Sequence, residues 1–150
     1  MTEITVTVWH NVALDGQGRP TGMLEGYQPG DPVVRVFTYQ AAPAGSPEQI
    51  AEEAFAICND HPRDARGADL ARRYYQRGLR SLSVGDVVAA GEAGLAVGRV
   101  GWTLVRGGLN EVRMSGCGTR PLPAPSPDEG TPGESPVDSS GRSRAGHDCP

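Results

Sequence analysis

The chain has 150 residues and a formal net charge of −4 at pH 7, and this length is typical of one domain. The acidic balance argues against a protein that is held on nucleic acid mainly by neutralising phosphates, because that mode of binding needs a clustered basic surface. Three widely spaced cysteines form no disulfide framework, and no apolar run has the length of a signal peptide or a membrane span. We therefore expect a cytoplasmic protein without a membrane partner.

The N-terminal third predicts two strands. From Ile4 to Val8, apolar residues alternate with threonine, which is the period of a strand that buries one face. Segment 23–27, which lies between expected turns, is predicted to be a short strand or an irregular packed segment. Residues 33–39 predict a central strand because both of its faces are largely apolar, with Val34, Val36 and Thr38 on one face and Val33, Arg35, Phe37 and Tyr39 on the other.

A first helix is predicted to begin at Pro47. Ser46, Pro47 and Gln49 have the pattern of a capping box, in which the serine and glutamine side chains bond to backbone N–H groups at the start of a helix. Apolar residues follow at helical spacing, and glutamates form the opposite face. The sequence at 59–62, which contains a proline, ends this helix.

A second helix is predicted from Arg66 or Ala68 to Arg77. Tyr74 lies on its inward stripe, together with other apolar residues at helical spacing. Gly78 stands just past the last turn, where a residue in the left-handed conformation ends many helices. The helix is therefore expected to stop at Arg77.

The following residues predict a hairpin and then a tail. A strand at 87–90, a turn at 91–94 and a return strand at 95–100 form the hairpin, and a weaker strand pair is expected from 102–105 and 111–114. From residue 119 the chain is rich in proline, glycine and serine, so residues 119–150 are predicted to be a disordered tail.

Together these patterns predict one α+β domain over residues 1–118. Its antiparallel sheet has four to five strands and is packed on one side by two helices. The expected element order is β-(β)-β-α-α-β-β.

No residue spacing in the chain matches a metal site, a nucleophile elbow or a phosphate-binding loop. We therefore predict no catalytic residue, no metal and no cofactor. One alternative stays open, because His10 and His61 could meet near Asp60 or Asp64 and form an acid–base pair of a small enzyme.

The second helix is the candidate surface for a partner. Arginines gather between residues 63 and 80 and lie beside two tyrosines, and such a mixture can bind a protein or stack on single-stranded nucleic acid. The alternative is a solvated helix face of mixed charge, because aspartates lie among the arginines. The candidate residues are Arg72, Arg73, Tyr75, Arg77 and Arg80.

Residues 74–102 carry a family resemblance. Tyr74-Tyr75 precede the run Arg80-Ser81-Leu82-Ser83-Val84-Gly85-Asp86-Val87-Val88, and Gly101-Trp102 follow it. This arrangement resembles the tyrosine-rich helix, the R-S-[LM]-S-V-G-D-V segment and the downstream glycine–aromatic pair of YodL-like domains, a signature shared by small actinobacterial proteins. The resemblance implies an accessory or interaction module, in some relatives linked to mobile genetic elements, and it supplies no catalytic residue.

The sequence thus leads to one hypothesis with two alternatives. The hypothesis is a non-enzymatic binding or regulatory accessory protein whose partner is a protein. The first alternative is a nucleic-acid-binding accessory factor that uses the second helix, and the second is a small enzyme that uses His10 or His61.

Overall fold

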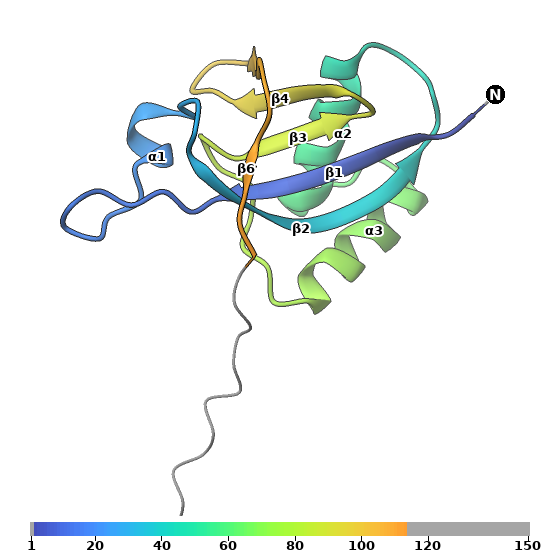
Figure 1. Cartoon of the computed structure of the whole chain (residues 1–150). Coiled ribbons are helices and arrows are strands. Elements are labelled where there is room, and N and C mark those ends of the chain that lie inside the picture. Colours follow the sequence, from blue (N-terminus) through green and yellow to red (C-terminus); the bar gives the residue numbers. More distant parts are fainter. Residues whose placement is uncertain (1, 114–150) are drawn as a thin grey trace, which may run out of the picture. The chain divides into compact units, whose positions relative to one another are not determined.

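The computed structural model describes residues 2–113, which form an α+β fold. The predicted fold class is therefore confirmed. The predicted tail 119–150 lies outside the described residues, as do Cys117 and Cys149. Figure 1 labels most of the elements, which in chain order are β1 (Ile4–Asn11), α1 (Gly22–Glu25), β2 (Pro32–Ala41), α2 (Pro47–Cys58), α3 (Ala65–Gln76), β3 (Val87–Ala90), β4 (Ala93–Val97), β5 (Trp102–Leu104) and β6 (Asn110–Glu111).

The strands form one sheet in the order β5-β4-β3-β1-β2-β6. β1 lies in the interior of the sheet and pairs antiparallel with β2 along its whole length, from Ile4 opposite Ala41 to Asn11 opposite Val33. On its other side β1 pairs antiparallel with β3, while β6 pairs in parallel with the first residues of β2. Within residues 2–113 the sheet has six strands, which exceeds the predicted number because β6 adds a short second edge.

A β-bulge in β2 changes which side chains share a face. Val8 pairs with Phe37 and Trp9 pairs with Arg35, so Val36 has no partner in the register. An extra residue on one strand reverses the alternation beyond it. Phe37 consequently packs in the core beneath the helices, whereas Val33 packs with Trp9 on the opposite face. The prediction that Val33 shares a face with Phe37 and Tyr39 is therefore wrong.

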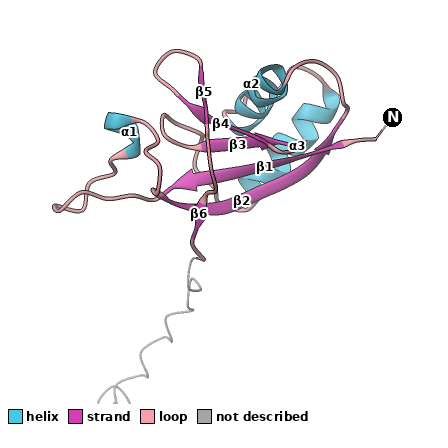
Figure 2. Ribbon diagram, turned by 45° about the horizontal axis from the view of Figure 1, so that its top comes forward, coloured by secondary structure: helices cyan, strands magenta, loops and turns pink. Residues whose placement is uncertain are grey.

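The weak strand pair expected near the end of the domain does not form. β5 pairs with β4, with Leu95 opposite Leu104, whereas β6 pairs with β2, with Pro32 opposite Asn110. The two segments therefore lie at opposite edges of the same sheet, although they are neighbours in the sequence (Figure 2).

Both long helices begin where a side chain caps them. Ser46 Oγ accepts a hydrogen bond from Gln49 N at 3.2 Å, and Gln49 Oε1 accepts one from Ser46 N at 2.8 Å, which confirms the capping box. At the start of α3, Asp64 Oδ1 accepts a bond from Gly67 N at 2.7 Å, so this helix begins slightly before the predicted residues. Gly78 has a φ of 71°, as expected for a residue that ends a helix in the left-handed conformation.

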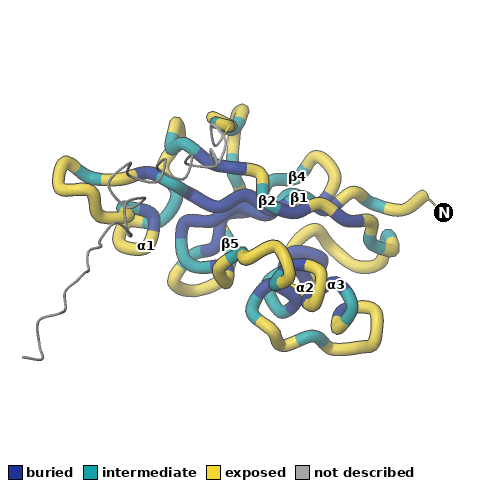
Figure 3. Tube along the Cα trace, turned by 90° about the horizontal axis from the view of Figure 1, so that it is seen from below, coloured by how far each residue is buried: buried dark blue, intermediate teal, exposed yellow. Residues whose placement is uncertain are grey.

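The helices α2 and α3 cover one face of the sheet, as Figures 2 and 3 show. The main core lies between them and the strands and includes Val8, Phe37, Ile57 and the fully buried Tyr74. A smaller cluster on the other face centres on Trp9, and segments outside the two helices cover it. α1 replaces the strand or irregular segment predicted near residues 23–27. No helix within residues 2–113 has the length and apolar character needed to span a bilayer.

Candidate functional site

The five candidate residues of the second helix and the turn after it differ in their exposure and in the groups that they contact. Arg72 and Arg73 are exposed on α3, and both form ion pairs with Asp69, at 2.8 and 2.7 Å. Arg77 is an exposed residue at the C-terminal cap of α3. The hydroxyl of Tyr75 donates to the carbonyl oxygen of Cys58 at 2.8 Å and therefore ties α3 to the end of α2.

Arg80 belongs to a network centred on Asp86, which is 1% exposed. The guanidinium donates Nη1–H to Asp86 Oδ2 at 2.7 Å and Nη2–H to Asp86 Oδ1 at 2.9 Å. The same carboxylate also accepts bonds from the backbone N–H groups of Asn11 and Ser83, both at 2.8 Å. We call Asn11, Arg80, Ser83 and Asp86 the Asp86 network.

The Asp86 network joins the turn before β3 to the end of β1. The Asn11 side chain donates to the Gly85 carbonyl oxygen at 3.1 Å and to Asp31 Oδ2 at 2.9 Å, and its own oxygen accepts from Ala13 N at 2.9 Å. Leu82 is 4% exposed and packs in the main core. The signature segment 80–88 therefore holds the fold together through a buried carboxylate, a buried leucine and a valine strand.

His10 is also held inside the protein. It is 7% exposed, and its Nε2 lies 2.8 Å from the hydroxyl oxygen of Tyr74. The Tyr74 hydroxyl donates its only proton to the carbonyl oxygen of Arg80, so the imidazole must be the donor to Tyr74. Burial lowers the pKa of His10 below its ordinary value of 6.5, and the Arg80 charge adds to this effect, while Asp86 opposes it. His10 is therefore neutral in the folded protein at pH 7.

This lowered pKa predicts a pH-dependent stability. Below about pH 6.5 the unfolded chain protonates His10 while the native state resists it, so the unfolded state binds more protons. We expect the free energy of unfolding to be level from about pH 8 to 7 and to fall as the pH decreases below about 6.5. Urea unfolding at a series of pH values measures it.

The control for this prediction is the other described histidine. His10→Gln should flatten the decrease, whereas His61→Gln should leave it in place because His61 is exposed. An equal slope in wild type and His10→Gln would contradict the assignment.

The polar residues that could form a catalytic group do not meet in one pocket. Arg80, Ser83 and Asp86 line a cavity of about 360 Å³ whose other walls are mainly apolar, and neither His10 nor Ser81 lines it. The Ser81 hydroxyl lies 2.9 Å from the hydroxyl of Tyr75. His61 is exposed in the turn between α2 and α3, where its backbone N–H bonds to Ala56. Among the described residues, no three His, Cys, Asp or Glu side chains form a group suited to a metal ion.

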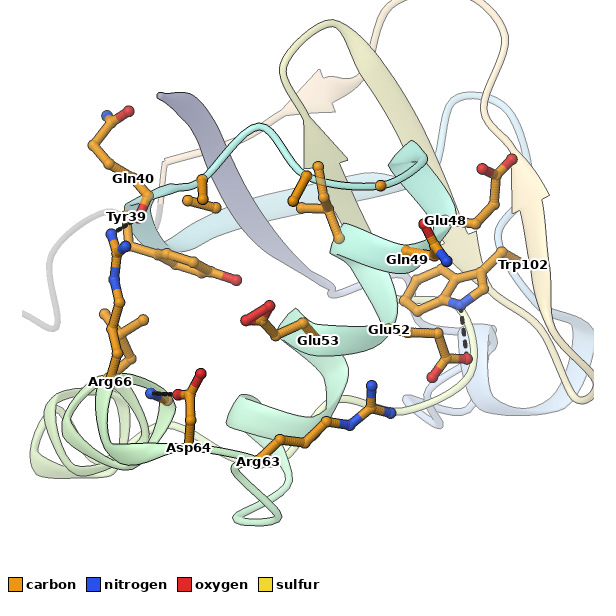
Figure 4. Close-up of a pocket in the computed structure, with 17 residues that line it drawn as sticks. Tyr39, Gln40, Glu48, Gln49, Glu52, Glu53, Arg63, Asp64, Arg66 and Trp102 are labelled. Atoms are coloured by element: carbon orange, nitrogen blue, oxygen red, sulfur yellow. Dashed lines mark hydrogen bonds between the residues drawn. The ribbon is translucent and has the colours of Figure 1, made fainter. Parts of the chain in front are cut away.

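A larger pocket lies elsewhere, against the outer face of α2. Its volume is about 830 Å³, and it is bounded by the end of β2 and the loop that follows, by α2, by the start of α3 and by Trp102 of β5 (Figure 4). We call it the acidic groove, because four carboxylates and only two guanidinium groups line it, a formal charge of −2. These charged residues are Glu48, Glu52, Glu53, Asp64, Arg63 and Arg66.

Several charges of the acidic groove already have partners. Arg66 donates to the carbonyl oxygen of Gln40 and lies 3.5 Å from Glu3, so its charge is partly neutralised. Trp102 Nε1–H donates to Glu52 Oε1 at 3.1 Å, and the indole packs edge to face with Phe55, with ring centroids 6.2 Å apart. The groove therefore combines an aromatic wall with exposed negative charge.

Tyr39 is the unusual residue of the acidic groove. It is 9% exposed, and its hydroxyl is a buried side-chain atom with no hydrogen-bond partner among residues 2–113. Figure 4 shows its ring extending from the end of β2 toward the space between Arg66 and Glu53. Burial raises the pKa of Tyr39 above its usual range, with smaller contributions from Cys58 and Glu53, so the phenol stays neutral.

Sequence reasoning did not single out this groove. The sequence pattern predicts that Tyr39 is one more aromatic residue of a strand and that the glutamates form the solvated face of a helix. No spacing in the sequence indicates that these residues and Trp102, which lies about sixty positions further along the chain, border one pocket.

The chain matches no protein-family model, no curated protein and no solved structure.

Proposed function

We propose that the protein is a non-enzymatic binding module and that the acidic groove is where it holds a segment of a partner protein. The observation that carries this proposal is the groove itself, an open pocket that joins a net negative charge to the aromatic side chains Tyr39 and Trp102. Pockets of about 300–1,000 Å³ with apolar walls and a few polar groups are the usual form of a ligand site. The implied role as an accessory module is also what the YodL-like resemblance suggests.

The arrangement of the other polar residues supports binding over catalysis. His10 is buried against Tyr74, and Asp86 accepts the bonds of the Asp86 network. These side chains stabilise the fold, and His10 lines neither of the two pockets described above, so it stands beside no site where it could act as an acid or base on a ligand. The cytoplasmic location expected from the sequence belongs to the same proposal.

The arrangement of the arginines favours a protein partner over nucleic acid. Arg72 and Arg73 share the carboxylate of Asp69, and Arg80 is bound to Asp86. A surface that binds phosphates needs cations that can release counterions, and these three already have carboxylate partners. We expect no binding to single- or double-stranded DNA or RNA in gel-shift assays at low salt, and measurable binding there would favour the nucleic-acid alternative.

Site-specific crosslinking in the native host tests the proposed function. A photoreactive residue at Ala44, which is exposed and lines the groove, is expected to yield a discrete adduct with one protein, and the same residue at the exposed Gln17 is expected not to. Replacing both Glu48 and Glu53 with arginine should abolish the adduct while the far-UV circular dichroism stays native. Equal adducts at both positions, or none at Ala44, would overturn the proposal.

A further inference from the structure

We propose that the acidic groove binds an arginine side chain of the partner's segment, with the guanidinium seated between Glu53 and the hydroxyl of Tyr39. This inference rests on the proposed function and names the chemistry of its ligand. It uses two independent observations, which are the charge of the groove and the unpartnered hydroxyl.

The first observation is electrostatic. Four carboxylates face two guanidinium groups around the groove, and one of those guanidinium groups, on Arg66, already contacts Glu3. A cation in the groove therefore meets an excess of negative charge. An anionic segment would be repelled by the same carboxylates, so charge complementarity selects a basic partner.

The second observation is the hydroxyl of Tyr39. Buried polar atoms in folded proteins nearly always have a hydrogen-bond partner, and leaving one unpaired costs free energy. Within residues 2–113 this hydroxyl has none, although the residue is 9% exposed and lines the groove. A donor supplied by a ligand would complete its bonding, and the oxygen of a neutral phenol can accept such a bond.

The position of Glu53 explains how one ligand group can use both features. Glu53 is exposed on α2 and lies across the groove from the start of α3 (Figure 4). The hydroxyl is buried although its residue lines the groove, so a ligand reaches it only when a side chain of the rim moves. We assign this movement to Glu53, which would turn toward the incoming cation.

Guanidinium fits this pair better than ammonium. Its planar group carries five N–H donors, so it can bond to a carboxylate and to a second acceptor in the same plane. It is also more weakly hydrated than an ammonium group and tolerates the aliphatic and aromatic walls that Leu70, Ile50 and Tyr39 provide here. The volume of about 830 Å³ leaves room for the residues on either side of the arginine.

Fluorescence anisotropy with the full-length protein tests the inference. The probes are labelled hexapeptides of alanine with two adjacent central arginines, two lysines or two glutamates. We expect the arginine peptide to bind more tightly than the lysine peptide, and the glutamate peptide not to bind. Glu53→Gln should weaken arginine-peptide binding by about tenfold or more, because it removes an ion pair with the guanidinium, and Tyr39→Phe by about threefold to tenfold, because it removes one hydrogen-bond acceptor of that group.

Two controls separate a specific site from adhesion to an acidic surface. Glu92→Gln removes the same charge from the exposed turn between β3 and β4 and should leave the affinity unchanged. Tyr39→Phe removes an unpaired hydroxyl, so its thermal stability should equal or exceed that of the wild type even though its affinity falls. If Tyr39→Phe has a lower thermal stability than the wild type, its lower affinity does not count as support for the inference. In that case Tyr39→Trp, which also lacks the phenol hydroxyl and adds bulk at the same place, must lose affinity for the arginine peptide.

Each remaining outcome overturns the inference. These are equal binding of the lysine and arginine peptides, binding that Tyr39→Phe leaves unchanged, binding of the glutamate peptide, and no binding of the arginine peptide. The proposed function would survive all of these if the Ala44 crosslink to a partner persists, because the photoreactive group captures any segment that is bound within its reach. Loss of the crosslink alone would overturn the proposed function.

Discussion

Asp86→Ala is expected to lower the free energy of unfolding by about 3 kcal/mol, because it removes the acceptor at the centre of the Asp86 network. The carboxylate is 1% exposed and accepts bonds from Arg80, Asn11 N and Ser83 N. Alanine would leave two backbone donors without their acceptor and the Arg80 guanidinium without its counter-charge. The Arg80 side chain is 47% exposed, so water solvates part of the freed guanidinium, and the expected loss is at the low end for a broken buried ion pair.

The measurement is urea or thermal unfolding of the purified chain. For a domain of this size the loss corresponds to a decrease in Tm of roughly 10–20 °C. The matched control is Asp69→Ala, which removes an aspartate that pairs with Arg72 and Arg73 on the exposed face of α3. Exposed ion pairs contribute about 0–1 kcal/mol, so this variant should stay close to the wild type. Equal losses in the two variants would show that burial of Asp86 contributes nothing beyond a surface ion pair.

Gly85→Ala is expected to have a comparable effect, of about 3 kcal/mol, for a different reason. Gly85 has a φ of 95°, where a Cβ atom is strained. A Cβ at this position would also lie 2.7 Å from both the Cα and the carbonyl oxygen of Gly22. These are backbone atoms of α1, so they cannot move away as a flexible side chain can. The substitution must shift either α1 or the turn that carries Asp86.

Gly101→Ala separates the two contributions. Gly101 has a φ of 71°, and a Cβ built there meets no atom within 4 Å. This variant therefore reports the backbone strain alone, which is about 1 kcal/mol. Denaturant midpoints of the two variants give the comparison, and the difference between them is the cost of the contact with Gly22. If Gly85→Ala is no less stable than Gly101→Ala, the turn and α1 are not in the close contact that the structure describes.

The local elements of this protein follow from its local sequence. The capping box at Ser46 and the glycine after α3 determine where α2 begins and where α3 ends, because they satisfy or terminate the hydrogen bonds of a few neighbouring residues. The alternation from Ile4 to Val8 likewise predicts β1, and the valines at 87 and 88 predict β3. Each of these signals acts over one or two turns of chain, so a single sequence contains it.

Contacts between distant segments are different. The bulge at Val36 depends on the register in which β1 pairs with β2. Because of this bulge, the side chains of Phe37 and Val33 lie on opposite faces of the sheet. β6 pairs with β2 across more than seventy residues, and a two-residue strand carries too weak a pattern to predict its partner. Such pairings depend on how much apolar surface the whole domain buries, and a short stretch of sequence does not contain that information.

The sequence by itself determined the α+β class and the framework of caps and alternating strands, since these arise from bonds among residues close together in the chain. The sequence also singled out the segment from Arg80 to Val88, but it did not show that the Asp86 carboxylate of this segment is buried. Only the tertiary structure decided that Arg80 would be bound to Asp86, and that Tyr39, Glu53 and Trp102 would border one pocket. The physical reason is that ion pairing and pocket formation depend on distance in space, and folding brings together residues that sequence separation keeps apart.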